Sequence, residues 1–515
     1  MADLADLSNA VIAVQDPGTS AGDLATIAQC HPTLRQLVAQ HPNAYPALID
    51  WIDAMSKGGE PMDPGSHPEH NPPIRAGRKA KKLWISLVCV LVAIAAAVSA
   101  YVFWYQPKNG GAIDQTKDDG AIVLGGSSAD QFRKVVVTPN GQVIAAGMTG
   151  SSDGDFTNSG VRQDWPGGVV SSISLGGSVN WTVYCPGTVM GIALTMDGEI
   201  VAVGSGDNSN TGAITKINSS GEVMWSERYD GRIDFYAVTI DQDGSIIVAG
   251  DTYASDGPFS VKGIFGSNNA FLAKLNPDGD LAWVKVFGGS EGYAGFWSVA
   301  LMSDGSIVAI GSVTTSDGDF AQMNGDSERE SAGLVRVASN GDVIWVKAFG
   351  YMRPLGIAVD QNDNIVAVGH SLSTDGDFPV DSENGDAVLA KFSPEGTLIW
   401  SKALGGSQRD NAFAAVTIGK DGSIVAVGGQ AKPNSGMQQQ QDALIASFDA
   451  EGNLKWSKTC GGKGEDQFGS VAVDSKGNLI AVGSTDSTTG NFIAKAGSSD
   501  AIIVPFDPDG NFIQK

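Results

Sequence analysis

A short apolar strand that follows a tight turn recurs along most of the chain. In QDGSIIVAG (242–250) and SDGSIVAIG (303–311), an Asp-Gly dipeptide precedes an apolar run that ends on glycine. Asp-Gly and Asn-Gly favour tight hairpins because one residue of the turn must adopt a positive φ angle. The phrase occurs seven times, at spacings of 46 to 61 residues, at 139–147, 196–204, 242–250, 303–311, 361–369, 420–428 and 475–483. The pattern therefore predicts seven repeats built from strands.

A second phrase lies between the copies of the first. It consists of a glycine followed four residues later by a tryptophan, as in GDLAW (279–283) and GDVIW (341–345), and in the last copy, GNFIQ (510–514), glutamine replaces the tryptophan. The two phrases divide each repeat into four strands, of which the fourth carries the tryptophan. We expect the six tryptophans to pack between neighbouring repeats: Trp181, Trp225, Trp283, Trp345, Trp400 and Trp456.

Seven four-stranded units predict a closed ring. One antiparallel sheet cannot bury both of its faces, whereas seven sheets packed radially can, so we expect an all-β seven-bladed β-propeller over residues 121–515. The chain ends at GNFIQK, midway through the fourth strand of the seventh repeat, and AIVLGG (121–126) supplies the missing piece before the first repeat. The two ends of the propeller should therefore share the last blade and leave no free edge.

The repeat also resembles a known family. The stretch LGGSSADQFRKVVVTPNGQVIAAGMTGSSDGDF (124–156) and its counterparts at 404–429 and 460–485 are similar to the bacterial SBBP-type β-propeller repeat, and the likeness extends over residues 121–515. The resemblance implies a propeller fold. It implies no activity, because that family is named for its repeat.

Residues 83–105, LWISLVCVLVAIAAAVSAYVFWY, carry no charge. At about 1.5 Å per residue, a helix of this length spans a hydrocarbon core of about 30 Å. Trp84 lies at one end, and Trp104 and Tyr105 lie at the other, where interfacial aromatic residues are expected. Five basic residues lie between positions 75 and 82, and Lys108 follows the segment, so the positive-inside rule places the N-terminus in the cytoplasm.

We therefore predict a single-pass cell-membrane protein with an extracytoplasmic propeller. A buried core helix and a cleaved signal peptide are the alternatives. The first conflicts with the uncharged length and its basic flank, and the second with the 82 residues that precede the segment. Residues 106–120 are expected to link the membrane helix to the propeller.

Residues 1–55 are expected to form a small α-helical domain. Thr19 or Ser20 can cap a helix that continues through Leu24 and Ile27, and prolines break the later segments. The phrase DPGTSAGDLATIAQCHPTLRQLVAQHPNAYPALIDWI (16–52) resembles the short helical head of bacterial variant leucine-rich-repeat proteins. The resemblance implies contact with a cytoplasmic protein. Residues 56–82, rich in Pro, Gly and charge, predict a flexible linker.

The charge balance limits the classes of partner. The net charge is −24, and nearly all of it lies after the membrane segment, because residues 1–105 contain 9 acidic and 7 basic side chains. Nucleic acid is excluded as a partner, since phosphate binding requires a basic surface. His370 is the only histidine of residues 121–515, which removes most hydrolase and zinc schemes, so we expect no catalytic residue, no metal site and no cofactor.

An acidic heptad occurs three times, as GSSDGDF (150–156), TTSDGDF (314–320) and LSTDGDF (372–378). Each copy falls between the second and third strands of its repeat, and these loops should share one face of the ring, where binding sites tend to lie. Such loops can hold Ca²⁺, which takes six to eight oxygen ligands. The alternative is turn chemistry with a phenylalanine tucked beneath the loop. The candidate ligands are Asp153, Asp155, Asp317, Asp319, Asp375 and Asp377.

Two further features bear on function. Cys185 and Cys460 occupy equivalent places in repeats one and six, too far apart around the ring for a disulfide, so two free thiols are expected. NPDGDLAW (276–283) resembles the tryptophan-docking repeat of quinoprotein propellers, although the acid-x-x-Thr-Gly spacing is missing.

The sequence favours a binding function, with a protein or glycan partner at the propeller loops in adhesion or scaffolding. A quinoprotein-like or lyase-type enzyme and a sensor that relays to the cytoplasmic head are the alternatives.

Overall fold

The computed structural model divides the 515-residue chain into two compact units, residues 1–106 and 107–515. The structure describes Ile27, Leu34 and Val38 and then residues 120–157, 167–206, 211–260, 268–315, 317–321, 330–373, 376–378, 380, 385–405, 411–432, 440–495 and 498–514. Ile27 and Val38 are buried and have helical backbone, and the other residues of the expected helical domain, apart from Leu34, lie outside the described residues. Within these ranges no helix is long and apolar enough to cross a membrane. The segment 83–105, with Trp84, Trp104 and Tyr105, lies outside the described residues, as do both linkers up to residue 119.

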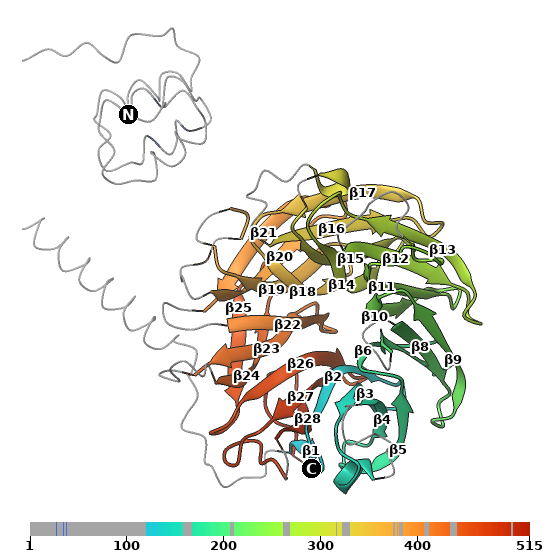
Figure 1. Ribbon diagram of the computed structural model, residues 1–515. Coiled ribbons are helices and arrows are strands. Elements are labelled where there is room, and N and C mark those ends of the chain that lie inside the picture. Colours follow the sequence, from blue (N-terminus) through green and yellow to red (C-terminus); the bar gives the residue numbers. More distant parts are fainter. Residues whose placement is uncertain are drawn as a thin grey trace, which may run out of the picture. The chain divides into compact units, whose positions relative to one another are not determined.

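The second unit is a seven-bladed β-propeller, as predicted (Figure 1). Each blade is an antiparallel sheet of four strands, and the first strands of all blades gather around one axis (Figure 1). Blades 1 to 3 comprise β2 (Asp130–Val137), β3 (Val143–Thr149), β4 (Gly167–Ile173) and β5 (Val179–Cys185); β6 (Val189–Leu194), β7 (Ile200–Ser205), β8 (Thr211–Ile217) and β9 (Val223–Asp230); and β10 (Ile233–Ile240), β11 (Ile246–Thr252), β12 (Asn269–Leu275) and β13 (Leu281–Phe287). Blades 4 to 6 comprise β14 (Ala294–Leu301), β15 (Ile307–Val313), β16 (Ser331–Val337) and β17 (Val343–Phe349); β18 (Arg353–Val359), β19 (Ile365–Ser371), β20 (Asp386–Phe392) and β21 (Leu398–Leu404); and β22 (Asn411–Ile418), β23 (Ile424–Ala431), β24 (Gln441–Phe448) and β25 (Leu454–Cys460). Blade 7 comprises β26 (Asp466–Val473), β27 (Leu479–Thr485), β28 (Asp500–Phe506) and β1 (Ile122–Leu124), and two short 3-10 helices, η2 (Gly154–Phe156) and η3 (Gly318–Phe320), lie in the loops.

Blade 7 is closed by both ends of the propeller. Ile122 of β1 pairs with Ile503 of β28, and Phe512, near the C-terminus, bridges Phe506 of the same strand. The fourth-strand position of this blade is therefore occupied by two separate pieces of chain. The predicted closure is confirmed, and it leaves the ring without an open junction.

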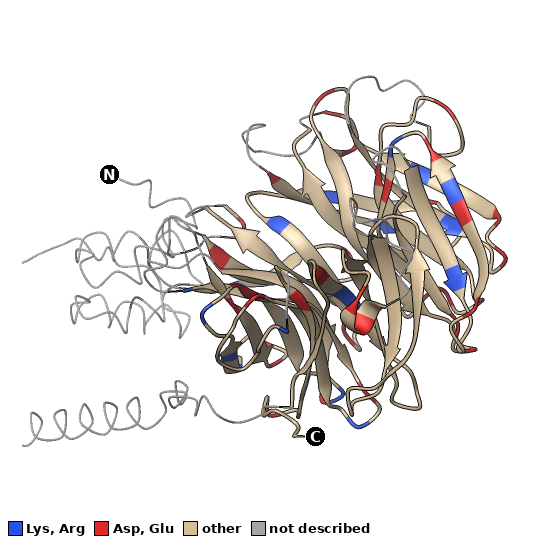
Figure 2. Cartoon of the chain, turned by 60° about the horizontal axis from the view of Figure 1, so that its bottom comes forward, with Lys and Arg blue, Asp and Glu red and all other residues tan. Residues whose placement is uncertain are grey.

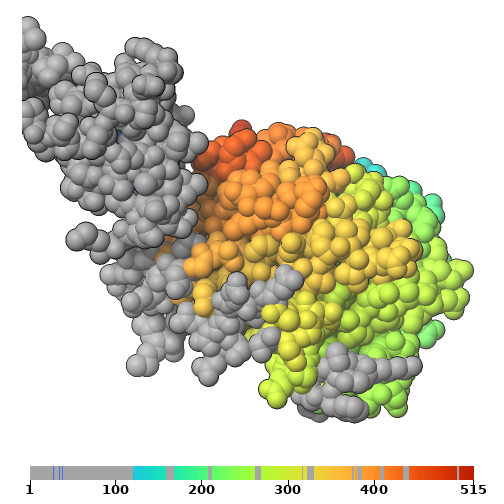
Figure 3. Space-filling view, turned by 90° about the horizontal axis from the view of Figure 1, so that it is seen from above, coloured from blue at the N-terminus to red at the C-terminus, as the bar shows by residue number. Residues whose placement is uncertain are grey.

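Two faces of the ring follow from the antiparallel order of the strands. The tight turns after the first and third strands lie on one face, which we term the turn face. The connections after the second and fourth strands lie on the other, the loop face. Every first strand begins at the loop face and ends at the turn face. Successive blades, coloured by sequence, pack directly against one another (Figure 3).

The core lies between the blades. The second and third strands are buried along nearly their whole length, and the hydrophobic clusters combine residues of adjacent sheets. Phenylalanines fill these layers: Phe235 of β10 contacts Phe259 of the loop between β11 and β12, with ring centroids 5.5 Å apart. Burial of such rings contributes on the order of 2 kcal/mol each before entropy is counted.

The blade tryptophans contact the next blade. The indole of Trp283 donates a hydrogen bond from Nε1 to the carbonyl oxygen of Ser339, 3.2 Å away in the turn between β16 and β17. At Gly221, which has a φ of +88°, an added Cβ would lie 2.6 Å from the Trp181 ring, so only glycine fits beneath the indole. The same indole-on-glycine contact joins Trp225 to Gly279, Trp283 to Gly341, Trp345 to Gly396, Trp400 to Gly452 and Trp456 to Gly510.

A cation that is buried in three blades and partly buried in a fourth lies opposite the tryptophan. Lys391 of β20 pairs across the strands with Trp400, forms a 2.8 Å ion pair with Asp360, and donates to the carbonyl oxygen of Ala450 in the next blade. Burial would raise the pKa of Asp360, but hydrogen bonds from Lys391 and Asn364 hold it below its ordinary value. The equivalent pairs are Lys216 with Glu199, Lys274 with Asp241, and Arg336 with Asp304.

Candidate functional site

The innermost strand of every blade contains a β-bulge at the same point near the loop face. In blade 1 the pairing of β2 with β3 shifts register between Phe132 and Lys134, which leaves Arg133 as the extra residue. Bulges re-aim side chains and are common at barrel rims and beside active sites. The seven extra residues are Arg133, Met190, Tyr236, Trp297, Leu355, Ala414 and Gly469, and we term this set the bulge ring.

Neighbours in the bulge ring touch one another around the axis. Arg133 of blade 1 contacts the sulfur of Met190 of blade 2 at 3.2 Å. The rings of Tyr236 and Trp297 lie 4.4 Å apart between centroids. Gly469 lies beside Arg133, because its Cβ would be 3.3 Å from the Arg133 Cα. The residues of the bulge ring are large and varied in blades 1 to 5 and small in blades 6 and 7. The opening at the ring axis on the loop face, which we term the axial mouth, is therefore asymmetric.

An acidic and aromatic cluster lies beside the bulge ring in blades 3 and 4. Asp251 is buried, with 3% of its surface exposed, and its Oδ2 accepts hydrogen bonds from the hydroxyls of Tyr293 at 3.0 Å and Tyr236 at 3.3 Å. Asp234 lies directly opposite Asp251 in the β10–β11 ladder. Trp297 covers Tyr236 and donates from Nε1 to the Ser312 hydroxyl at 3.1 Å.

The environment of Asp251 changes its acidity. Burial raises the pKa of Asp251 to about 7, the negative charge of Asp234 adds to the rise, and the hydrogen bond from Tyr293 opposes it. Burial and the charge of Asp251 raise the pKa of both tyrosines, which keeps their hydroxyls as donors. A carboxyl group that titrates near neutrality can take up or release a proton at physiological pH.

A cavity of about 310 Å³ opens at the axial mouth between blades 7 and 1. Gln131 of β2 and Gln467 of β26 both donate hydrogen bonds to the Ser484 hydroxyl at 3.4 Å, which joins the inner strands of the two blades. The lining residues are Ala129, Gln131, Met148, Glu465, Gln467, Ser484, Asp486, Ser498 and Ser499. Amide and hydroxyl groups of this kind recognise polyols and other hydrogen-bonding ligands.

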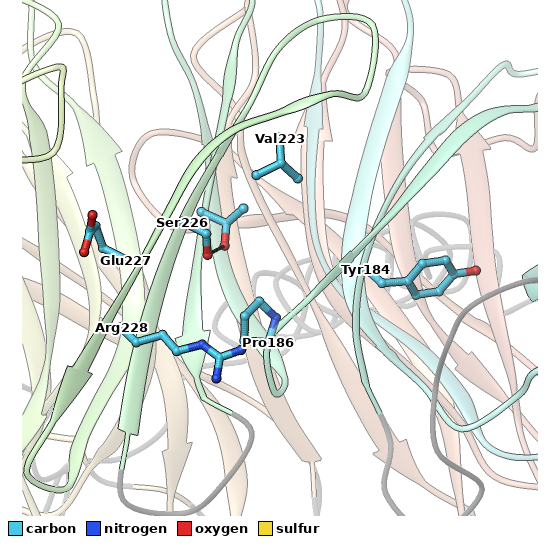
Figure 4. A pocket seen from close by; sticks show the side chains of 7 residues that line it. Tyr184, Pro186, Val223, Ser226, Glu227 and Arg228 are labelled. Carbon is cyan, nitrogen blue, oxygen red and sulfur yellow. Dashed lines mark hydrogen bonds between the residues drawn. The ribbon is translucent and has the colours of Figure 1, made fainter.

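A larger cavity, of about 560 Å³, lies on the outer side of blades 1 and 2 between β5 and β9 (Figure 4). Thr215 and Ser226 share a hydrogen bond of 2.9 Å on its wall, and its charged residues, Glu227 and Arg228, belong to the outermost strand (Figure 4). Cys185, the last residue of β5, is a free thiol whose burial raises its pKa to about 12, and Cys460 is also buried. The cavity at the axis carries more varied chemistry, so we place the candidate site there.

The carboxylates of the acidic heptads bind their own backbone. In blade 4, Asp319 accepts a hydrogen bond from the Gly288 amide at 3.0 Å, and Asp317 accepts one from the Ser290 amide at 2.8 Å. Phe320 is buried beneath the loop. In blade 1, Asp155 and Asp153 bind the amides of Gly125 and Ser127, in blade 5 Asp377 binds the amide of Gly350, and Phe156 and Phe378 are buried.

The heptads therefore hold each loop to the start of its blade through hydrogen bonds from backbone amides to the Asp carboxylates. This is the turn chemistry that the sequence offers as the alternative to Ca²⁺ binding. Asp375 lies outside the described residues. No group of three or more His, Cys, Asp or Glu side chains that could hold a metal ion occurs in the described part of the chain.

Acidic residues lie mainly in the turns and loops at the strand ends, and basic residues lie mostly along the strands (Figure 2). The bulge ring and the cluster around Asp251 were not predicted. Their signal is a break in alternation, since the buried residues Phe132 and Val135, like Phe468 and Val471, are three positions apart where a regular strand needs an even number.

Comparisons with known proteins bear on the two units separately. Residues 8–65 match the family model described as "Leucine Rich Repeat Variant domain", in agreement with the resemblance of the head. Over 146 residues the chain is 27% identical to "Regulatory protein FlaEY" of Caulobacter vibrioides, which covers 26% of this chain and 15% of that protein. The chain thus spans a small part of the length of this curated relative.

Several solved structures match this chain at low identity. Virginiamycin B lyase from Staphylococcus aureus is 12% identical with a TM-score of 0.41, covering 74% of this chain and 97% of that one. The Pan2 WD40 domain of Neurospora crassa has the same identity, TM-score and coverage of this chain, with 90% of its own length covered. A Bacteroides caccae protein of unknown function is 13% identical with a TM-score of 0.37, covering 66% and 93%. These similarities give no information about the function of this chain.

Proposed function

We propose that this protein is a membrane-anchored protein of the cell envelope whose extracytoplasmic propeller binds a protein or glycan partner at the loop face. The observation that carries the proposal is the bulge ring, in which one repeated backbone feature presents seven different residues at one axial mouth. A bulge that served only the fold would not need this variety. Rigid scaffolds that carry varied residues at one opening are typical binding sites.

The test is a glycan and protein array probed with the purified full-length protein. Trp297→Ala removes a half-buried member of the bulge ring, and Met196→Ala, at a residue 78% exposed on the turn face, is the matched control. We expect Trp297→Ala to weaken binding of the captured partner about tenfold or more and Met196→Ala to leave it unchanged. Binding that survives every substitution in the bulge ring would contradict the proposed site.

Membrane anchoring is supported by the uncharged segment 83–105 and its basic N-terminal flank. It is tested by alkaline extraction of membranes and by protease treatment of intact spheroplasts. We expect the protein to stay with the membrane, the propeller to be digested from outside and the head to be protected. Release at high pH, or digestion of the head alone, would overturn the arrangement.

A second candidate function, an enzyme of lyase type at the loop face, is favoured by one observation. Asp251, beside the bulge ring, combines a pKa of about 7 with two tyrosine hydroxyls on one oxygen, an arrangement suited to proton transfer. The array partner should then be converted to a new product, detected by mass spectrometry. Turnover by the wild type and its loss in Asp251→Asn would support an enzyme, and an unchanged partner would leave the protein as a binder.

A further inference from the structure

Two adjacent cations on the innermost strand of blade 1 have no counter-charge within the described part of the chain. Arg133 donates from Nε to Gln131 Oε1 at 3.1 Å, and its terminal nitrogens contact the sulfur atoms of Met190 at 3.2 Å and Met148 at 3.7 Å. A guanidinium carries five N–H donors, and thioether sulfur is a weak acceptor. Lys134, the next residue, is half-buried and forms no ion pair among the described residues.

The cations on the third strands of blades 2 to 5 are neutralised. Lys216, Lys274, Arg336 and Lys391 each lie within 2.8 Å of a carboxylate oxygen. Arg133 and Lys134 depart from this pattern in a chain with a large excess of acidic residues. Burial lowers the pKa of both cations, and the charge of Arg133 lowers that of Lys134 further. Since a desolvated charge without a partner is costly, the pair is poised to accept an anion.

The cavity between blades 7 and 1 lies next to Arg133, which is not itself among the lining residues. Two of its lining residues, Gln131 and Met148, contact Arg133 directly. Gly469, the member of the bulge ring on blade 7, places no side chain beside Arg133. The two acidic residues of the lining, Glu465 and Asp486, are exposed, so water solvates their charges at the outer rim.

The uncharged groups of the lining narrow the class of ligand. Gln131, Gln467 and Ser484 form one hydrogen-bonded set that can exchange its internal bonds of 3.4 Å for bonds to the hydroxyls of a sugar. A cation pair next to amides and a hydroxyl matches a sugar that carries an acidic group. Guanidinium binds carboxylate and phosphate alike, through paired N–H donors.

We propose that the cavity between blades 7 and 1, together with Arg133, which two of its lining residues contact, and the adjacent Lys134, is a subsite for an acidic glycan, whose carboxylate or phosphate group pairs with the two cations. Gln131, Gln467 and Ser484 bind adjacent sugar hydroxyls. This assignment rests on the proposed binding function and specifies its ligand. It also explains why an acidic protein keeps two adjacent cations at its axial mouth.

The test measures binding of three probes to the full-length protein by calorimetry and thermal shift: glucuronate, glucose 6-phosphate and glucose. We expect the acidic sugars to bind and to raise Tm, and glucose to bind more weakly by about tenfold or more. The first two probes distinguish carboxylate from phosphate. Added salt should weaken the acidic sugars more than glucose, because it screens the charge pairing.

The double variant Arg133→Gln, Lys134→Gln should lose about tenfold or more of its affinity for the acidic sugars. The control is Lys347→Gln, which removes a positive charge from the exposed strand β17 and should change nothing. Equal binding of the acidic sugars by the double variant, or no binding of either by the wild type, would overturn the proposal.

A second readout needs no variant. Acylation of Lys134 in the wild-type protein, quantified by mass spectrometry, should slow in glucuronate or glucose 6-phosphate and not in glucose. Unchanged labelling of Lys134 would also count against the site. If the array instead yields a neutral glycan or a protein whose binding is insensitive to the double variant, the acidic subsite fails and the general binding function stands.

Discussion

Ile122 and Ile503, from opposite ends of the propeller, are paired in one antiparallel ladder of blade 7. The hydrogen bond from the Ile513 amide to the Pro505 carbonyl oxygen, 3.0 Å long, continues the same edge with the C-terminal piece. The ring is therefore held shut by non-covalent contacts at this seam, whereas each other blade is one continuous stretch of chain.

Loss of packing at the seam should destabilise the propeller. Leu124 is 3% exposed and packs in the cluster that joins blades 7 and 1, so Leu124→Ala should cost about 2–4 kcal/mol of unfolding free energy. Ile399→Ala, at a residue 52% exposed on β21, should cost less than about 0.5 kcal/mol. Urea unfolding of the full-length protein measures both values. Similar values for the two variants would show that the seam contributes little to stability.

A second prediction concerns the contribution of the indole-on-glycine contact to stability. Gly221→Ala and Gly198→Ala both place a side chain at positive φ, at a cost of about 1 kcal/mol. Only Gly221 also meets the Trp181 ring, whereas no heavy atom lies within 4 Å of an added Cβ at Gly198. Gly221→Ala should therefore be the more destabilising variant by about 1–3 kcal/mol in thermal or urea unfolding. Equal losses would mean that the indole moves aside freely.

The buried cations should matter more than exposed ones. Lys391→Met leaves Asp360 of the same blade without its 2.8 Å partner and removes the hydrogen bond to Ala450 of blade 6, and we expect a loss of about 3 kcal/mol. Lys455→Met breaks a pair with Asp421 whose side chains are 43% and 57% exposed, and we expect a loss below about 1 kcal/mol. Chemical unfolding near pH 7 compares them. A Lys391→Met variant as stable as Lys455→Met would contradict the assigned role.

Asp251 should give the propeller a distinctive pH dependence. Its pKa is about 7 in the folded protein and near 3.8 in the unfolded chain, so the folded state holds the proton more tightly between these values. The contribution of Asp251 to stability is therefore fully present below about pH 4, falls as the pH rises, and is lost above about pH 7, by up to about 4 kcal/mol.

Asp251→Asn removes this titration, and its stability relative to the wild type should rise from pH 4 to pH 7. The exposed Asp197→Asn variant is the control and should track the wild type. Unfolding measured at pH 4, 5.5 and 7 gives the comparison. A constant difference between Asp251→Asn and the wild type would show that Asp251 does not titrate in this range.

The heptad carboxylates should act as loop clamps. Asp319→Ala removes the acceptor of the Gly288 amide and should lower stability by about 1 kcal/mol. Because Asp317 and Asp319 are engaged by backbone amides, we expect the same Tm in Ca²⁺ and in EDTA for both proteins. A rise in Tm with Ca²⁺ that disappears in Asp319→Ala would instead assign the heptads to calcium.

Much of the architecture could be predicted from the sequence, because its signals are local. Asp-Gly and Asn-Gly turns and the repeated tryptophan define seven units of four strands, and the unfinished last repeat, with Gln514 at its end, indicates how the ring closes. The internal cations also leave a local trace, since Lys216, Lys274, Arg336 and Lys391 interrupt apolar strands at one position. Their acidic partners lie in separate turns, so pairing could not be assigned in advance.

The candidate site was harder to predict because it depends on register. The members of the bulge ring range from Gly469 to Trp297 and share no side-chain chemistry, so a search for repeated residue types passes over them. Only the three-residue spacing of buried positions such as Phe132 and Val135 indicates the bulge. The cavity at the axis brings together Gln131 of blade 1 and Gln467 of blade 7, and no local sequence pattern marks either residue as part of a site.

The indole-on-glycine contact has a consequence for how such rings change size during evolution. Six of the seven junctions use the same joint, from Trp181 on Gly221 to Trp456 on Gly510, and each joint is encoded within two successive repeats. Unequal recombination between repeats could insert or delete a whole blade at any of these six places and recreate the same joint. The junction from blade 7 to blade 1, where Gln514 stands in place of the indole, is the one boundary that such an exchange must leave untouched.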